Sequence, residues 1–175
     1  MEQNTILVFD TETTGLFPKG EDVNNIQKYP YITQLSYVVY DCNKKEIVYT
    51  FDSYINIDPS IHLSDIVKEL TGVTREKLDN GIDMLSALKT FYKYYAMSNW
   101  IVAHNIQFDQ KMMTIETERH REAIQYSHPE CLALFNPYFE KTKNIRSYCT
   151  MLKGKDICNI VLPSKFEGGR SYKKV

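Results

Sequence analysis

A short apolar run that ends in two closely spaced acids constrains this chain more than any other feature. Residues 6–9 read Ile-Leu-Val-Phe, and Asp10, Thr11 and Glu12 follow directly. A run that is apolar throughout and partly β-branched predicts a strand buried on both faces. Because side chains alternate along a strand, we expect Asp10 and Glu12 on the same face, at the end of that strand.

Two carboxylates on one face of a strand end repel each other, and burying them is unfavourable unless a cation lies between them. Mg²⁺ and Mn²⁺ prefer carboxylate oxygen, so a divalent metal is the simplest candidate for that cation. The alternative is an ordinary strand that runs into an acidic turn, which is the commoner origin of an isolated Asp-x-Glu tripeptide. The residues elsewhere in the chain decide between these two interpretations.

Size and composition are those of one soluble domain. The chain has 175 residues, of which 43% are hydrophobic and 25% are charged, and this is enough to form a single core. No apolar stretch approaches the roughly 20 residues of a membrane span, and no signal sequence precedes the first strand, so we predict an intracellular protein of the cytoplasm or nucleus. Four cysteines form no C-x-x-C pair and are expected to be reduced thiols. They are Cys42, Cys131, Cys149 and Cys158.

Charge is distributed unevenly along the chain. Residues 141–175 contain nine basic and two acidic side chains, a net charge of +7, and since the whole chain carries −1, residues 1–140 carry −8. A basic segment beside an acidic body suits a partner with a phosphate backbone, although a solvated basic tail is the simpler alternative for charge alone. We assign residues 1–162 to one domain and residues 163–175 to a basic, mobile tail.

The hydrophobic pattern predicts a mixed central sheet. Residues 31–41 and 46–56 are rich in Val, Ile, Tyr and Phe and indicate two more strands, joined by a turn at residues 41–44. Three strands in succession favour an antiparallel meander. A further buried strand at residues 100–103 follows a helix, and this order favours a crossover to a parallel neighbour.

Capping residues and apolar spacing predict the helices. Ser64 is expected to cap a short helix that Gly72 ends, and Thr74 to begin a second one. Asp83 is expected to cap a longer helix that ends at Asn99. The apolar stripe of this longer helix consists of Met84, Leu88, Phe91 and Tyr95. The pattern assigns residues 126–144 to no element, and residues 145–152 to either a strand or the start of a helix.

A second chemical motif follows the strand at residues 100–103. Residues 103–109 read Ala-His-Asn-Ile-Gln-Phe-Asp and lead into a helix at about residues 107–121, which Asn105 can cap. Asp109 falls in the first helical turn, where the helix dipole favours a negative charge. Taken alone, Asp109 would be a surface acid, but with the two strand acids it becomes a third candidate ligand.

Two strings carry a family resemblance. Phe-Asp-Thr-Glu-Thr-Thr-Gly-Leu at residues 9–16 and Ala-His-Asn-x-x-Phe-Asp at residues 103–109 resemble the first and second exonuclease motifs of the DEDD (DnaQ-like) 3′→5′ exonuclease family. Leu-Thr-Gly-Val-Thr at residues 70–74 also looks like a segment of that family, and the resemblance extends from Thr5 to about Leu152. It implies an α/β, ribonuclease H-like fold, in which a mixed sheet is flanked by helices.

The resemblance also implies roles for individual residues. Two ions of Mg²⁺ or Mn²⁺ would hydrolyse the terminal phosphodiester, with Asp10 bridging both ions, Glu12 holding the ion that binds the attacking water, and Asp109 supporting the other. The side chains expected to contact the terminal nucleotide are Thr13, Leu16, Asn105 and Phe108. For Phe108 a place in the core is the alternative, and Asn105 is in the first place a helix cap. His104 is expected to be structural, because the general base of the family comes from a third motif.

That third motif, His-x-Ala-x-x-Asp or Tyr-x-x-x-Asp, has no match. After Asp109 the only aspartate is Asp156, and Lys153 rather than Tyr or His lies near it. The chain is therefore expected to be a fragment of a longer exonuclease. There are two alternatives. The chain could be a short form without catalysis, which would be an inactive nucleic-acid or protein-binding module, or a partner chain could supply the aspartate of the third motif, the fourth acid of the site.

The substrate and the pathway stay open. The predicted substrate is single-stranded or 3′-end nucleic acid, and the sequence does not distinguish DNA from RNA. The sequence is compatible with a proofreading subunit that has a polymerase partner, with a repair nuclease and with an RNA-trimming enzyme. It is also compatible with a homodimer.

Overall fold

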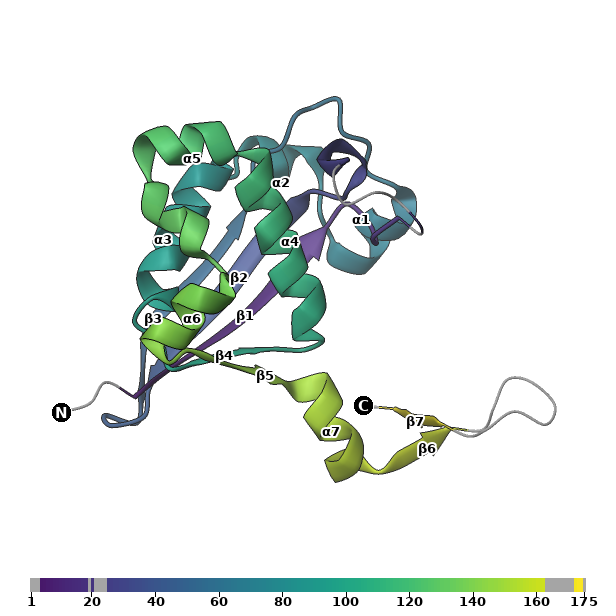
Figure 1. The fold of residues 1–175 in the computed structure, drawn as a ribbon. Helices are drawn as coiled ribbons and strands as arrows, with labels where there is room; N and C mark the ends of the chain where they lie inside the picture. Colours follow the sequence, from purple (N-terminus) through teal and green to yellow (C-terminus); the bar gives the residue numbers. More distant parts are fainter. Residues whose placement is uncertain (1–3, 19, 21–24, 163–171, 175) are drawn as a thin grey trace.

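A five-stranded mixed sheet forms the centre of the molecule (Figure 1). The computed structural model describes residues 4–18, 20, 25–162 and 172–174. The strand order is β3-β2-β1-β4-β5; β1 pairs with β2 and β2 with β3 antiparallel, whereas β1 pairs with β4 and β4 with β5 parallel. The predicted meander and parallel crossover are both confirmed. The strands are β1 (Thr5–Thr13), β2 (Ile32–Asp41), β3 (Glu46–Tyr54), β4 (Trp100–Ala103) and β5 (Arg146–Cys149).

Helices fill most of the connections between the strands. The α-helices are α1 (Asp65–Thr71), α2 (Arg75–Asp79), α3 (Met84–Tyr95), α4 (Ile106–Arg119), α5 (Arg121–Ser127), α6 (Pro137–Lys143) and α7 (Thr150–Cys158). Two 3₁₀ helices, η1 (Ile26–Lys28) and η2 (Pro129–Ala133), and a two-stranded sheet of β6 (Ile160–Leu162) and β7 (Tyr172–Lys174) complete the described chain. No helix within residues 4–18, 20, 25–162 and 172–174 is both long and apolar enough to cross a membrane.

The three predicted side-chain caps are confirmed. The side chains of Ser64, Thr74 and Asp83 each accept a hydrogen bond from a backbone N–H three residues further on. Gly72 ends α1 in the left-handed conformation, at φ 66°, where a residue without Cβ is favoured. Helix α3 ends earlier than predicted, with Ala96 as its C-cap residue, and the chain then turns into β4.

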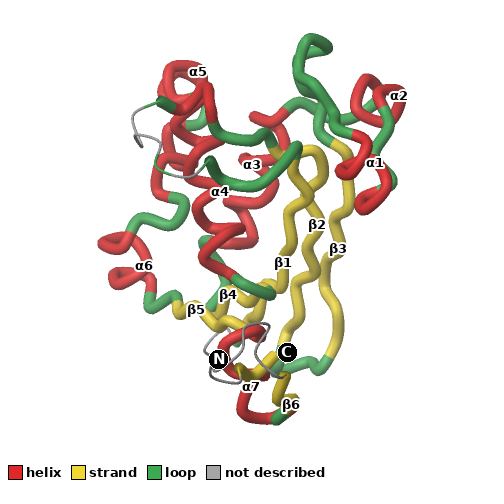
Figure 2. The backbone as a smooth tube through the Cα atoms, turned by 90° about the vertical axis from the view of Figure 1, so that its right-hand side faces the viewer, coloured by secondary structure: helices red, strands yellow, loops and turns green. Residues whose placement is uncertain are grey.

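Within the part of the chain that the structure describes, helices cover one face of β1 and leave the other exposed, so the prediction that both faces are buried is wrong. Leu7 and Phe9 are fully or almost fully buried, whereas Val8 between them is 43% exposed. Figure 2 shows α3, α4 and α5 together on one side of β1 and β2. We call this side the covered face and the opposite side the open face. An apolar run predicts burial of its residues, but the packing of distant helices decides which face is covered.

Aromatic rings make up the centre of the core on the covered face. The Phe91 ring of α3 lies 5.2 Å from that of Phe9, 5.3 Å from that of Tyr37 and 6.1 Å from those of Tyr95 and Phe135, centroid to centroid. All four residues of the predicted apolar stripe of α3 are buried. Offset and edge-to-face ring pairs at these separations add to the stabilisation that burial alone provides.

The two segments that the sequence left open are now assigned. Residues 126–144 form the end of α5, then η2 and α6, and they pack against α3, where the Tyr95 hydroxyl donates to Glu140 Oε1 at 3.0 Å and accepts from the Phe135 N–H at 3.0 Å. Residues 145–152 contain both β5 and the start of α7. Most of the proposed tail lies outside the described residues, and the domain boundary at residue 162 stays a prediction.

Replacing Phe91 by alanine should destabilise the protein by about 3–5 kcal/mol, because the cavity would lie where several rings meet. Chemical denaturation followed by circular dichroism measures this free energy of unfolding. Lys89→Ala, an exposed position on the same helix, is the control and should change it by less than about 0.5 kcal/mol. Equal effects of the two substitutions would contradict the ring cluster as the centre of the core.

Candidate active site

The two strand acids lie on the open face of β1, as the alternation predicts. Asp10 and Glu12 occupy the same row as the exposed Val8, and Asp10 is itself exposed while Glu12 is half-buried. In the neighbouring strand β2, Ser36 lies opposite Asp10 and Gln34 lies opposite Glu12. A bulge follows directly between Glu12 and Thr13, so the acids mark the last regular part of the β1–β2 ladder.

Asp109 reaches the same strand from the covered face. It lies in the first turn of α4, as predicted, but it is 2% exposed and therefore not a surface acid. Its Oδ1 accepts hydrogen bonds from the Thr11 N–H at 3.0 Å and from the Thr11 hydroxyl at 2.7 Å. Thr11 lies between Asp10 and Glu12 and points to the covered face, so one strand segment holds all three acids near each other.

The charge of Asp10 disfavours the charged forms of the other two acids. The pKa of Asp109 is raised to about 6: burial raises it most and the Asp10 charge adds to the increase, while the hydrogen bonds from Thr11 oppose both. The pKa of Glu12 is raised by burial and by the Asp10 charge. Within the described residues, the groups that act on the pKa of Asp109 include no cation. Such a cluster favours either protons or a bound divalent cation.

The chemistry of these donors fits a divalent metal, but the three acids do not form a ready cage. Carboxylate oxygens are the ligands that Mg²⁺ and Mn²⁺ prefer. Across the described ranges, no group of three or more His, Cys, Asp or Glu side chains is placed to hold a metal ion. Asp109 is bound to Thr11, whose side chain points to the covered face, whereas Asp10 and Glu12 lie on the open face.

His104 connects the end of β4 with the start of α7. Its side chain is exposed, and its Nδ1 lies 3.1 Å from the Thr150 hydroxyl, which itself donates to the Ala103 carbonyl at 3.3 Å. The charge of His104 lowers the pKa of Asp10, against the larger effect of burial. His104 therefore has both the predicted structural contact and an electrostatic effect on the first acid.

Two of the four predicted nucleotide contacts, Thr13 and Leu16, lie at the end of β1 and just after it. The Thr13 side chain is buried on the covered face, and its hydroxyl donates to the Gly15 carbonyl at 2.7 Å, so this hydroxyl already has an acceptor. Leu16 is 84% exposed. An apolar side chain that projects so far into solvent is available to pack against a ligand.

The other two predicted contacts lie at the start of α4. Asn105 holds the N-cap position, but its side chain makes no capping hydrogen bond, so that part of the prediction is wrong. The reason is its left-handed conformation, at φ 61°, in which its backbone carbonyl accepts from the Phe108 N–H at 2.8 Å. The Phe108 ring packs against the Phe17 ring at 4.7 Å between centroids. Core packing and nucleotide contact both stay open for Phe108.

The sequence interpretation missed two features of the site. Thr11 appeared only as the spacer between two acids, although an alternating strand places it where it can hold a buried partner. Asp52 of β3 lies opposite Ser36, and it accepts at 2.6 Å from both the Ser36 hydroxyl and the Gln34 side chain. These two hydrogen bonds lower the pKa of Asp52 and orient the β2 side chains beside Asp10 and Glu12. The side chain of Asp156 lies outside what the structure describes.

Comparisons with known proteins identify the family of this chain. The family model described as Exonuclease (RNase_T) matches residues 7–167, which include all three acids. The DNA polymerase III PolC-type proteins of Streptococcus pyogenes serotype M2 (strain MGAS10270) and serotype M5 (strain Manfredo) are each 33% identical over 120 residues, 69% of this chain. The chain spans only 7% of the length of these relatives.

Solved structures share the fold at low sequence identity. E. coli exonuclease I in complex with a dT13 oligonucleotide matches 89% of this chain and 30% of that one, with a TM-score of 0.65 and 12% identity. The nuclease domain of 3′hExo, a DEDDh family member bound to rAMP, matches 68% of this chain and 60% of that one, with a TM-score of 0.51 and 19% identity. The predicted ribonuclease H-like fold is confirmed. The family match over residues 7–167, together with the acids that end β1 and begin α4, shows that this chain belongs to the exonuclease family.

Proposed function

We propose that this chain acts as a metal-dependent 3′→5′ exonuclease domain that releases nucleoside monophosphates from the 3′ end of a nucleic acid. The observation that supports this most directly is the set of three acids that β1 and α4 bring to one strand segment, with no cation among the described groups that act on Asp109. The family to which the chain belongs is generally dependent on divalent metal ions.

Asp10, Glu12 and Asp109 are the residues that would hold the metal, which we propose to be two ions of Mg²⁺ or Mn²⁺. When bound, such ions activate a water molecule and stabilise the leaving 3′-oxygen. The chain itself keeps Asp109 in place through the two hydrogen bonds from Thr11. Because Asp109 is buried, this preorganisation places one ligand without a large loss of side-chain entropy on binding.

The residues around the acids would orient the terminal nucleotide. The exposed Leu16 would pack against its base, and Asn105 would provide a polar group beside it. Phe108 would contact the sugar or base from the start of α4. For Thr13 we propose a contact through the backbone, since its hydroxyl already donates to the Gly15 carbonyl.

Both DNA and RNA are compatible substrates. One structure with this fold contains a dT13 oligonucleotide, and another is of a 3′-exonuclease that recognises the 3′ end of a histone mRNA stem-loop. The similarity to a PolC-type DNA polymerase supports a polymerase as partner and proofreading as pathway. We propose single-stranded 3′ ends as the substrate class, in the cytoplasm or nucleus, and a homodimer is the alternative assembly.

A binding module without catalysis is the second candidate. The observation that favours it is that no described group of three or more ligand-type side chains is arranged to hold a metal. This candidate predicts nucleic-acid or protein binding that survives chelation of divalent metals. The exonuclease predicts metal binding through the three acids, and hydrolysis from the 3′ end.

Asp10→Asn should reduce Mn²⁺-dependent shortening of a 5′-labelled oligonucleotide by about 10³-fold or more, because it removes one of the two carboxylates that β1 presents on the open face. Denaturing gels of single-stranded DNA and RNA substrates measure the shortening, and titration calorimetry measures Mn²⁺ binding. Asp65→Asn is the control, since it removes an exposed acid of α1 away from this strand segment. Undiminished Mn²⁺ binding and hydrolysis in Asp10→Asn would reject the metal site.

Asp109→Asn should stabilise the metal-free protein at neutral pH by about 2 kcal/mol, or about 5 °C in melting temperature. The folded-state pKa of about 6 lies above the usual value for an aspartate, so the folded state binds more protons than the unfolded one between about pH 4 and 6. The wild-type protein therefore loses stability as pH rises through that range, and the substitution removes this loss.

Thermal unfolding in chelator at pH 4.5 and 7.5 measures the effect, which should be larger at pH 7.5. Asp65→Asn changes an exposed acid of α1 and is the control. Excess Mn²⁺ should raise the melting temperature of the wild type more than that of Asp109→Asn, since the metal binds only the folded site. If the wild type instead gained thermal stability relative to Asp109→Asn as the pH rises from 4.5 to 7.5, a raised pKa for Asp109 would be contradicted.

A further inference from the structure

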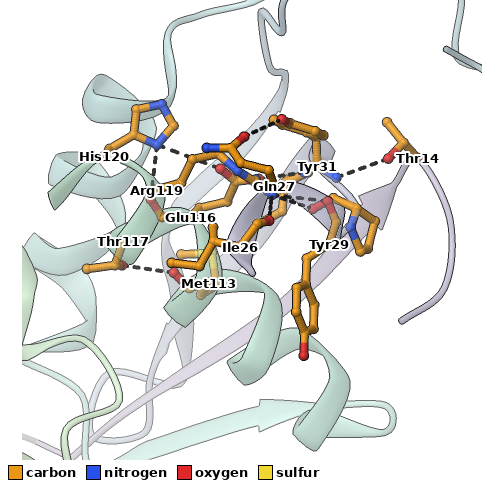
Figure 3. Close-up of polar contacts among 12 residues, drawn as sticks. Thr14, Ile26, Gln27, Tyr29, Tyr31, Met113, Glu116, Thr117, Arg119 and His120 are labelled. Carbon is orange, nitrogen blue, oxygen red and sulfur yellow. Dashed lines mark hydrogen bonds and ion pairs between the residues drawn. The ribbon is translucent and has the colours of Figure 1, made fainter. Parts of the chain in front are cut away.

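A buried ion pair at the end of α4 binds the loop that connects β1 to β2 (Figure 3). The Arg119 Nη1 donates to Glu116 Oε1, and the side chains are 7% and 2% exposed. We call these two residues the Glu116–Arg119 clasp. They are three positions apart on one helix, a spacing that usually gives a weak surface pair, but here both are removed from water.

The clasp makes an unusually large number of contacts with backbone groups. The Arg119 Nη2 lies within hydrogen-bond distance of three carbonyls, those of Ile26 at 3.2 Å, Tyr29 at 3.1 Å and Pro30 at 3.2 Å. The Glu116 Oε1 also accepts from the Ile32 N–H at 3.0 Å. A guanidinium has several donors in a fixed plane, so one side chain can hold a carboxylate and several carbonyls together.

These contacts fix the returning arm of the loop, residues 25–31. The guanidinium also lies over the Tyr31 ring, 3.7 Å from its centroid, which adds a cation–π interaction. His120 contributes on the helix side, where its Nδ1 lies 3.0 Å from the Glu116 carbonyl. As Figure 3 shows, Arg119 and Glu116 point from α4 toward Ile26, Tyr29 and Tyr31.

The returning arm in turn supports the outgoing arm, residues 14–18. The Thr14 N–H donates to the Tyr31 carbonyl at 2.9 Å, and the Tyr31 N–H donates to the Thr14 hydroxyl at 3.0 Å. The Tyr29 ring packs against the Phe17 ring at 5.9 Å between centroids. Phe17 is the direct neighbour of the exposed Leu16, so a contact path runs from Arg119 through Tyr29 to the residue expected to meet the base.

Helix α4 therefore holds this loop at two points. Phe108 at its first turn packs against Phe17, and Arg119 at its last turn holds the carbonyls of the returning arm. Asp109 belongs to the same first turn. Since a helix is rigid over this length, the metal-site acid and the outgoing arm keep a constant separation.

We propose that Glu116 and Arg119 are positioning residues for the 3′-terminal nucleotide: they hold the loop so that Leu16 stands against the terminal base. This proposal rests on the proposed exonuclease function. It assigns the clasp an effect on the binding of the terminal nucleotide and none on the metal site itself.

Arg119→Lys tests the proposal in the 175-residue chain. Lysine keeps the positive charge beside Glu116, but a single ammonium cannot reach the carboxylate and three carbonyls together. We expect KM for a 5′-labelled oligonucleotide to rise about tenfold, with kcat within threefold of the wild type. Mn²⁺-dependent hydrolysis of bis(p-nitrophenyl) phosphate, which has no terminal nucleoside, should stay within twofold.

A double-mutant cycle with Leu16→Ala separates positioning from general destabilisation. If the clasp acts through Leu16, Arg119→Lys should raise KM little further in the Leu16→Ala background. Arg121→Lys is the matched control, because Arg121 pairs with Glu118 on the surface and holds no loop. If Arg119→Lys fails to fold, Glu116→Gln replaces it, since the amide still offers an acceptor to the Ile32 N–H.

Three results would overturn the proposal: an unchanged KM in Arg119→Lys, an equal loss with both substrates, or additive effects with Leu16→Ala. A wild type that hydrolyses neither substrate would reject the proposed exonuclease function, and fluorescence anisotropy of a labelled oligonucleotide then decides on the clasp. The proposal is supported if Kd for the oligonucleotide is tenfold higher in Arg119→Lys and unchanged in Arg121→Lys. In the Leu16→Ala background, Arg119→Lys should then raise Kd little further. An equal Kd in wild type and Arg119→Lys overturns it.

Discussion

Two buried carboxylates of α4 attach this helix to the central sheet, and the rest of the site depends on that attachment. Asp109 accepts the N–H of Thr11 in β1, and Glu116, seven residues further on, accepts the N–H of Ile32 in β2. Thr13 lies opposite Ile32 in the ladder, so both N–H groups belong to the same end of the sheet. Seven residues are about two helical turns, which places both acids on one side of the helix. One helix thus satisfies two backbone donors at that end of the sheet.

The two acids differ in how their charge is balanced, and this difference separates structure from chemistry. Glu116 has a buried guanidinium beside it, so its charge is matched within the fold. For Asp109, burial and the charge of Asp10 raise the pKa. Among the described groups that act on it, the hydroxyl and N–H of Thr11 lower the pKa, but not enough to cancel that rise. A buried carboxylate without a cation is unfavourable in a structural role but appropriate in a site that binds metal.

Local signals in the sequence predicted local structure well. The caps at Ser64 and Thr74 involve only a side chain and an N–H three residues away, so a short stretch specifies them. The open face of β1 could not be predicted, because it depends on which side α3, α4 and α5 occupy. The acids of the candidate site were selected through their spacing and family resemblance, whereas no feature of the sequence singled out the Glu116–Arg119 clasp. Its partners lie about 90 residues away in sequence, and only the folded chain brings them together.

The strand order has a consequence for the time at which the site forms during folding. The first strand of the chain is the middle strand of the sheet, and its parallel neighbour begins only at Trp100. On a ribosome, β1 can pair with β2 early, but it must wait for the synthesis of most of the chain before β4 and α4 arrive. Until then Asp10 and Glu12 lie on the outer strand of a three-stranded meander, without Asp109. Metal affinity should therefore appear late in folding, as a measure of the final long-range pairing rather than of the early hairpins.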